Sequence, residues 1–110
     1  MITVTLLRAG GRIQGFTCSG HAGYGTAGKD IVCSAVSALT QTCLIGLTQV
    51  ANIQAGVSIS ETDGIACILE ADMPEEQAQK AQLLLETLEA GLRSIDEAYP
   101  KTLKIRSREV

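Results

Sequence analysis

Two long segments of the chain repeat apolar residues at the spacing of an α-helix, and this pattern limits the possible folds more than any other feature. In the first, from about residue 31 to 51, the apolar face consists of Val32, Val36, Leu39, Cys43, Leu47 and Val50. In the second, which opens at Pro74 and ends before Pro100, it consists of Ala81, Leu84, Leu85, Leu88, Leu92, Ile95 and Tyr99. Each helix therefore needs a layer against which to bury one face.

The other segments have the patterns of strands. Residues 2 to 8 alternate apolar and polar side chains, and the turn residues of "RAGGR" lead into a second strand at 12 to 19. Two apolar runs flank Asp63-Gly64, which predicts a hairpin, and a last strand follows at about 102 to 107. The order ββαββαβ predicts one α+β domain over residues 1 to 110, with two long helices packed on an antiparallel or mixed sheet.

The charge balance argues against a nucleic-acid-binding or membrane-surface protein. The formal net charge is −3, from 12 acidic and 9 basic residues, so no overall field attracts polyanions, and we expect no direct nucleic-acid binding. The C-terminal segment "KTLKIRSREV" places Lys104, Arg106 and Arg108 on one side of a strand. This stripe fits either a solvated edge strand or a surface that binds a partner.

The N-terminal segment reads as a strand, not as a secretory signal. We find no apolar run near the roughly 20 residues of a membrane span, so we expect a cytoplasmic protein without a membrane partner. Its four cysteines should then be reduced, and their irregular spacing gives no disulfide framework. Cys43 on a helical face and Cys67 in mid-strand are expected to be packing residues.

The stretch "SGHAGYGTAGKDIVCSAVSAL" at 19 to 39 contains the only histidine, His21, and a cysteine, Cys33, that we expect near the start of a helix. Its "GYGTAG" has the spacing of a dinucleotide fingerprint. That fingerprint requires a parallel βαβ unit and an acidic residue about 20 positions on, whereas Glu61 follows Gly28 by 33 positions and leads into a hairpin. We therefore expect no nucleotide and no other cofactor.

A zinc site is the second reading, with Cys18, His21 and Cys33 as ligands. Positions 18 and 21 point to opposite faces of a regular strand, so both could bind one ion only if the strand ended between them. No cysteine or histidine pair elsewhere in the sequence supplies a fourth ligand at typical spacing. We predict no metal site.

The third reading is a thiol nucleophile with a histidine partner. Asp30 is a suitable N-cap, which would place Cys33 in the first helical turn, where free amides and the helix dipole stabilise a thiolate. His21 has the ordinary pKa best suited to proton transfer near neutrality, and the glycine-containing loop between the two can bend. On these residues alone, the alternative of a surface histidine and a buried helix-start cysteine remains open.

At these residues the sequence resembles the ribosomal-processing cysteine proteases called Prp. The resemblance lies in "GHA" at 20 to 22 and in "G-K-DIVCSAVSAL" at 28 to 39, with the family's spacing of histidine and cysteine. Ser34 is a small departure, since many relatives have alanine there. Elsewhere the likeness is one of pattern, and the order of strands and helices fits the family's α+β fold.

The resemblance implies a role for each residue of the segment. Cys33 would be the nucleophile, His21 its partner, and Asp30 a supporting residue that caps the helix or orients the site. It also implies a homodimer that removes the N-terminal extension of large-subunit ribosomal protein twenty-seven, cleaving after aromatic residues. The alternative is a non-catalytic ribosome-associated binding module that uses the basic C-terminal strand.

The loop between the two catalytic positions is expected to close only over bound peptide. We predict a substrate-gated loop made of Ala22, Gly23, Tyr24, Gly25 and Gly28, because a glycine-rich segment is costly to order.

Overall fold

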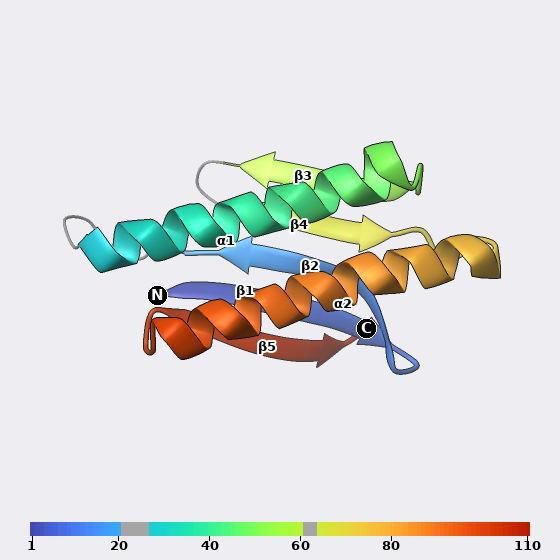
Figure 1. Cartoon of the computed structure of the whole chain (residues 1–110). Helices are drawn as coiled ribbons and strands as arrows, with labels where there is room; N and C mark the ends of the chain where they lie inside the picture. The colour runs from blue at the N-terminus through green and yellow to red at the C-terminus, as the bar shows by residue number, and fades with distance from the viewer. Residues whose placement is uncertain (21–26, 61–63) are drawn as a thin grey trace.

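The described part of the chain forms five strands and two long helices (Figure 1). The computed structural model describes residues 1–20, 27–60 and 64–110, with the backbone alone for 27–30. The elements are β1 (Ile2–Ala9), β2 (Arg12–Ser19), α1 (Ala27–Ile45), the π-helix η1 (Gly46–Val50), β3 (Ala55–Ser60), β4 (Gly64–Leu69), α2 (Glu75–Ala98) and β5 (Leu103–Glu109). The predicted order ββαββαβ is confirmed.

The strands form one mixed sheet in the order β3-β4-β2-β1-β5. All neighbouring strands are antiparallel except β1 and β5, which are parallel. The β1–β2 hairpin turns at Gly10 and Gly11, whose φ angles of 59° and 81° suit glycine. Both long helices lie on the same face of the sheet (Figure 1), which confirms the predicted α+β layering.

The core lies between the sheet and the two helices. Its strand side includes Leu6 and Phe16, and its helix side includes Val36 and Leu85, all at most 1% exposed. Cys43 and Cys67 are buried within it, as predicted.

The prediction that Val50 and Tyr99 belong to the apolar faces of the two helices is wrong. Val50 is 76% exposed and Tyr99 is 40% exposed. Val50 lies in η1, whose wider turn changes the direction of the side chains that follow Ile45. Tyr99 lies just past the end of α2, with φ −130° and ψ 72°, and so leaves the helical face.

The first helix is also longer and more apolar than the sequence reading allowed. The segment Ile31–Val50 has 20 residues and is apolar enough to cross a membrane by length and composition, so the expectation that no segment reaches this length is wrong. The core helix of a soluble protein has the same properties. Here Val32, Val36 and Leu47 of this segment are buried in the core, which accounts for its apolar face.

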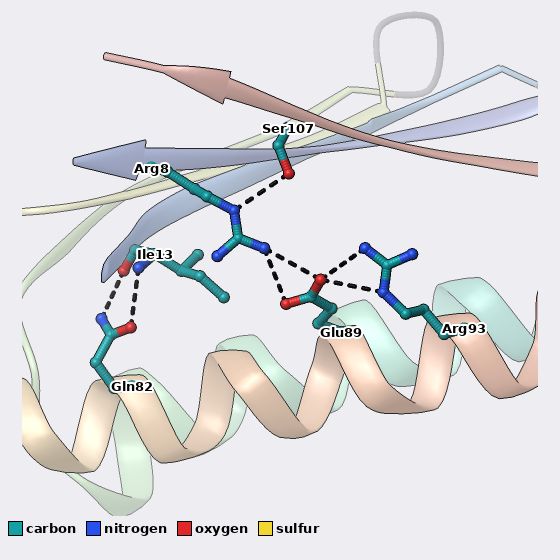
Figure 2. A network of polar contacts seen from close by, with 6 residues as sticks. All are labelled: Arg8, Ile13, Gln82, Glu89, Arg93 and Ser107. Carbon is teal, nitrogen blue, oxygen red and sulfur yellow. Dashed lines mark hydrogen bonds and ion pairs between the residues drawn. The ribbon is translucent and has the colours of Figure 1, made fainter. Parts of the chain in front are cut away.

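Polar contacts fix α2 against the strands (Figure 2). The Arg8 guanidinium of β1 donates to both carboxylate oxygens of Glu89, at 3.0 and 3.1 Å, and to the Ser107 hydroxyl of β5 at 3.1 Å. The Gln82 side chain accepts from the Ile13 amide at 2.9 Å and donates to the Ile13 carbonyl at 2.7 Å. These contacts fix where α2 lies along the sheet.

Glu89 should stabilise the fold only while its carboxylate is ionised. Burial opposes ionisation, but the contacts with Arg93 and Arg8 outweigh it and hold the Glu89 pKa below the ordinary 4.5. A lowered pKa stabilises the fold above the unfolded-state value, and this stabilisation is lost as pH falls through the folded-state value. Since the pair is partly screened by solvent, we expect Glu89→Gln to lower the free energy of unfolding by about 1 kcal/mol near neutral pH.

Urea denaturation of the wild type and of Glu89→Gln measures this difference. Each protein is measured at two pH values, one near neutral and one well below the ordinary glutamate pKa. The two proteins should converge in stability at the lower pH. A difference that persists unchanged there would contradict the role of the Glu89 charge.

Gly64 begins β4 at a position that no other residue fits. Its φ is +88°, and a Cβ built on it would lie 1.9 Å from the Cys18 carbonyl oxygen. Gly11 is a matched control, because its φ is +81° but nothing lies within 4 Å of its Cβ position. We expect Gly11→Ala to cost about 1–2 kcal/mol of backbone strain and Gly64→Ala to cost about 3 kcal/mol or more, because β2 must also move.

Thermal or urea denaturation of the two variants measures the difference. Equal losses at Gly11 and Gly64 would show that the close approach of β4 to Cys18 does not constrain the fold.

Candidate active site

Cys33 lies on α1 and lines a cavity between this helix and the sheet. The cavity has a volume of about 380 Å³, which is within the range of small-ligand pockets. The cysteine side chain is half-buried and packs partly against the core. Its sulfur is therefore placed on a helix, next to a space that can hold part of a second molecule.

The helix side of the cavity follows from the periodicity of α1. Val36, Ser37, Thr40 and Gln41 follow Cys33 at three-, four-, seven- and eight-residue spacings and line the same space. Thr40 is fully buried, and its hydroxyl donates to the Val36 carbonyl oxygen at 2.9 Å. A polar group thus lies in the cavity wall without an unsatisfied donor.

The strand side comes from the ends of four strands. Ile2 of β1, Cys18 of β2, Ile59 of β3 and Ile65 of β4 line it. Gly20, the last described residue before the histidine, also lines it. None of the described lining residues is Asp, Glu, Lys or Arg, so this part of the cavity suits an uncharged group.

The start of α1 differs from the prediction. The helix begins at Ala27, not at Ile31, so Asp30 lies inside it and is not its N-cap. Gly28 likewise lies in the helix and not in a loop. The earlier start has a physical reason, because each residue added to a helix adds one hydrogen bond. Alanine favours a helix, and a single glycine inside one costs only about 1 kcal/mol.

This correction changes the surroundings of the thiol. Cys33 is the seventh residue of α1, whereas the free amides of a helix belong to its first four residues. The proposal that first-turn amides stabilise the Cys33 thiolate is therefore wrong. The position of Cys33 at the cavity does not depend on that proposal.

The predicted partner of Cys33 lies outside the described residues. His21 and the loop residues Ala22, Gly23, Tyr24 and Gly25 belong to this part of the chain. The imidazole–thiol pair and the substrate-gated loop therefore stay predictions. Gly20, which precedes His21 in the sequence, lines the cavity.

Comparisons with known proteins show the family to which the chain belongs. The family model described as cysteine protease Prp matches residues 1–104. The chain belongs to the cysteine protease Prp family. It is 30% identical over 110 residues to the ribosomal processing cysteine protease Prp of Bacillus subtilis (strain 168), with 96% of each chain covered.

Two crystal structures of Prp from Staphylococcus aureus share the fold. The essential ribosomal processing protease in complex with a substrate peptide has a TM-score of 0.83 and 25% identity, and the form with a covalently linked product peptide has 0.81 and 26%. In both comparisons the match covers 98% of this chain and 100% of the other. The protein is thus a ribosomal processing cysteine protease of the Prp family, and the alternative of a non-catalytic binding module is wrong.

The other three thiols of this Prp protein are unsuited to be its nucleophile. Burial raises the pKa of Cys43 to about 12 and that of Cys67 to about 11. Burial also raises the pKa of Cys18 to about 11, and the neighbouring Cys33 adds to the rise. Near neutral pH these three remain protonated, and a thiol is a far weaker nucleophile than a thiolate.

Two of the three residues considered for zinc do lie at one cavity, since Cys18 and Cys33 both line it. The third, His21, is outside the described residues. Within the part of the chain that the structure describes, no group of three His, Cys, Asp or Glu side chains could hold a metal ion.

Sequence reasoning missed Thr40 and Ile59 as cavity residues. The signal for Thr40 was available, because its seven-residue spacing from Cys33 returns to the same face of a helix. Ile59 could be found only from the register of the β3–β4 hairpin, in which it lies opposite Ile65. A hairpin turn predicts that two strands pair, but not which cavity they reach.

Proposed function

We propose that this protease removes the N-terminal extension of large-subunit ribosomal protein twenty-seven, with Cys33 as nucleophile and His21 as its acid–base partner. The observation that carries the proposal is the half-buried Cys33 at an uncharged cavity of about 380 Å³. The S. aureus relatives with a substrate peptide and with a covalently linked product peptide support it.

The chemistry assigned to the pair is acyl transfer. The Cys33 thiol passes its proton to His21, and the sulfur attacks the carbonyl carbon of the scissile peptide bond. His21 then gives that proton to the leaving amine as the C–N bond breaks. A thioester then links the N-terminal product to Cys33. His21 takes a proton from water, which hydrolyses the thioester and restores the thiol.

We further propose that the enzyme is a homodimer in the cytoplasm that needs no cofactor and does not bind nucleic acid directly. The net charge of −3 supports the last point. The basic side chains Lys104, Arg106 and Arg108 alternate with Leu103 and Ile105 along β5, and so lie on the sheet face away from the helices and from the cavity.

The experiment that tests the proposed substrate is incubation with the extended ribosomal protein of the same organism. Mass spectrometry of the new N-terminus should show one cut, directly after an aromatic residue of the extension. An uncut precursor, with other peptides still cleaved, would show that the substrate is different. Several cuts within the folded part of the protein would contradict a processing role.

A further inference from the structure

The two edges of the sheet differ in how they are protected. An exposed edge strand is a template for pairing with another extended chain, and proteins usually guard it with charges or proline. The edge strand β5 carries the exposed Lys104, Arg106 and Arg108. The opposite edge, β3 (Ala55–Ser60, sequence AGVSIS), has neither charge nor proline. Within the described sheet, β3 is thus the edge open to strand addition.

The helices cover the side chains on their face of β3 only in part. Val57 lies opposite Cys67 and Ile59 opposite Ile65 in the β3–β4 register, so both point to the helix-covered face. Cys67 is fully buried, yet Val57 is 43% exposed and Ile59 is 69% exposed. The helix layer therefore covers β4 and leaves an apolar shelf, consisting of Val57 and Ile59, at the edge of the sheet.

This apolar shelf is continuous with the active-site cavity. Ile59 and Ser60 line the same cavity as Cys33, so the C-terminal end of β3 forms part of its wall. A chain lying along β3 would reach the cavity at Ile59. In Figure 1, β3 lies beyond β4 at the edge of the sheet, where no described strand separates it from an incoming peptide.

We propose that the substrate peptide binds as an added strand along the outer edge of β3 and enters the cavity at its Ile59 end. This inference rests on the proposed function of Cys33. Main-chain hydrogen bonds to β3 would supply affinity, and every second peptide side chain would lie on the shelf of Val57 and Ile59. β3 is six residues long, so the peptide segment lying beside it would be about as long. The ligand class is an extended peptide with uncharged, apolar residues at alternate positions near the cut.

Two substitutions separate this role from a general effect on the sheet. Ile59→Asp places a charge on the shelf, and Ile68→Asp is its matched control. Ile68 is 54% exposed but lies opposite Gly56 on the other face of the sheet. We expect Ile59→Asp to lower kcat/KM for a peptide spanning the cut by about 10- to 100-fold, mainly through KM, because an apolar contact is lost. Ile68→Asp should stay within about twofold of the wild type.

Backbone pairing is tested with wild-type enzyme and peptides that carry one N-methyl group each. An added strand donates from alternate amides, so methylation at every second position should raise KM about fivefold or more, with little effect at the positions between. Turnover of the unmethylated peptide is the control for the proposed function itself. If that peptide is not cut, the proposed function fails, and equal cutting of all methylated peptides overturns only the pairing with β3.

A second copy of the chain is the rival occupant of this edge. If Ile59→Asp converts a dimer to a monomer in light scattering while KM is unchanged, then β3 is an interface between copies and the proposal is wrong. If KM rises while the oligomeric state is unchanged, the peptide is the occupant.

Discussion

Replacing Cys33 by alanine should reduce cleavage of the extended ribosomal protein by at least about 10,000-fold, because the nucleophile is lost and burial keeps the other three thiols protonated near neutral pH. Cys33→Ser should be nearly as inactive, since a hydroxyl ionises far less readily than a thiol. Single-turnover assays with excess enzyme measure the residual rate. Both variants should keep the fold, because Cys33 is only half-buried.

Cys18 provides the matched control for this experiment. It lines the same cavity as Cys33, but burial raises its pKa to about 11, and we assign it no chemistry. Cys18→Ser should therefore retain cleavage. Full activity of Cys33→Ala would contradict the assignment of Cys33 as the nucleophile. Loss of activity in Cys18→Ser with an intact fold would contradict the expectation that Cys18 takes no part in the chemistry.

His21→Ala should lower kcat by about 100- to 10,000-fold with little change in KM, because general acid–base catalysis contributes this much to proton transfer. The loss should be smaller than that of Cys33→Ala, since the nucleophile remains. Steady-state kinetics across the neutral pH range measures both constants. The activity that remains should also lose the pH dependence that a histidine imposes near its ordinary pKa of about 6.5.

A His21→Ala enzyme with at least about half of the wild-type kcat would contradict the dyad. In that case another group must protonate the leaving amine. Among the described cavity residues, none is an aspartate, glutamate, lysine or arginine, so such a group would have to come from elsewhere in the chain or from the substrate.

The strands and helices could be predicted because apolar residues repeat along each of them with a single clear period. In β1, Ile2, Val4 and Leu6 are buried, and Thr3 and Thr5 between them are only partly buried. The same holds for α2, in which Ala81, Leu85, Leu88 and Leu92 are buried at helical spacing. The choice between an antiparallel and a mixed sheet required the structure, because the pairing of β1 with β5 joins the two ends of the chain.

The site was only partly predictable. Cys33 could be found from its local sequence, but the start of α1 could not, because Gly28 disfavours a helix interior and Asp30 is a good N-cap, so both predict a later start than Ala27. The cavity is lined by residues of α1 and of four strands, and no short motif encodes this arrangement. Ile59 reaches the cavity only because β3 and β4 pair in one particular register.

Alkylation by iodoacetamide near neutral pH tests most directly the central claim that Cys33 is the activated nucleophile. Peptide mapping by mass spectrometry follows each cysteine while cleavage is measured in the same samples. The account predicts that Cys33 is modified well before Cys18, Cys43 and Cys67, and that activity falls in proportion to its modification. Equal modification of all four thiols, or full cleavage by protein whose Cys33 is completely alkylated, would contradict it.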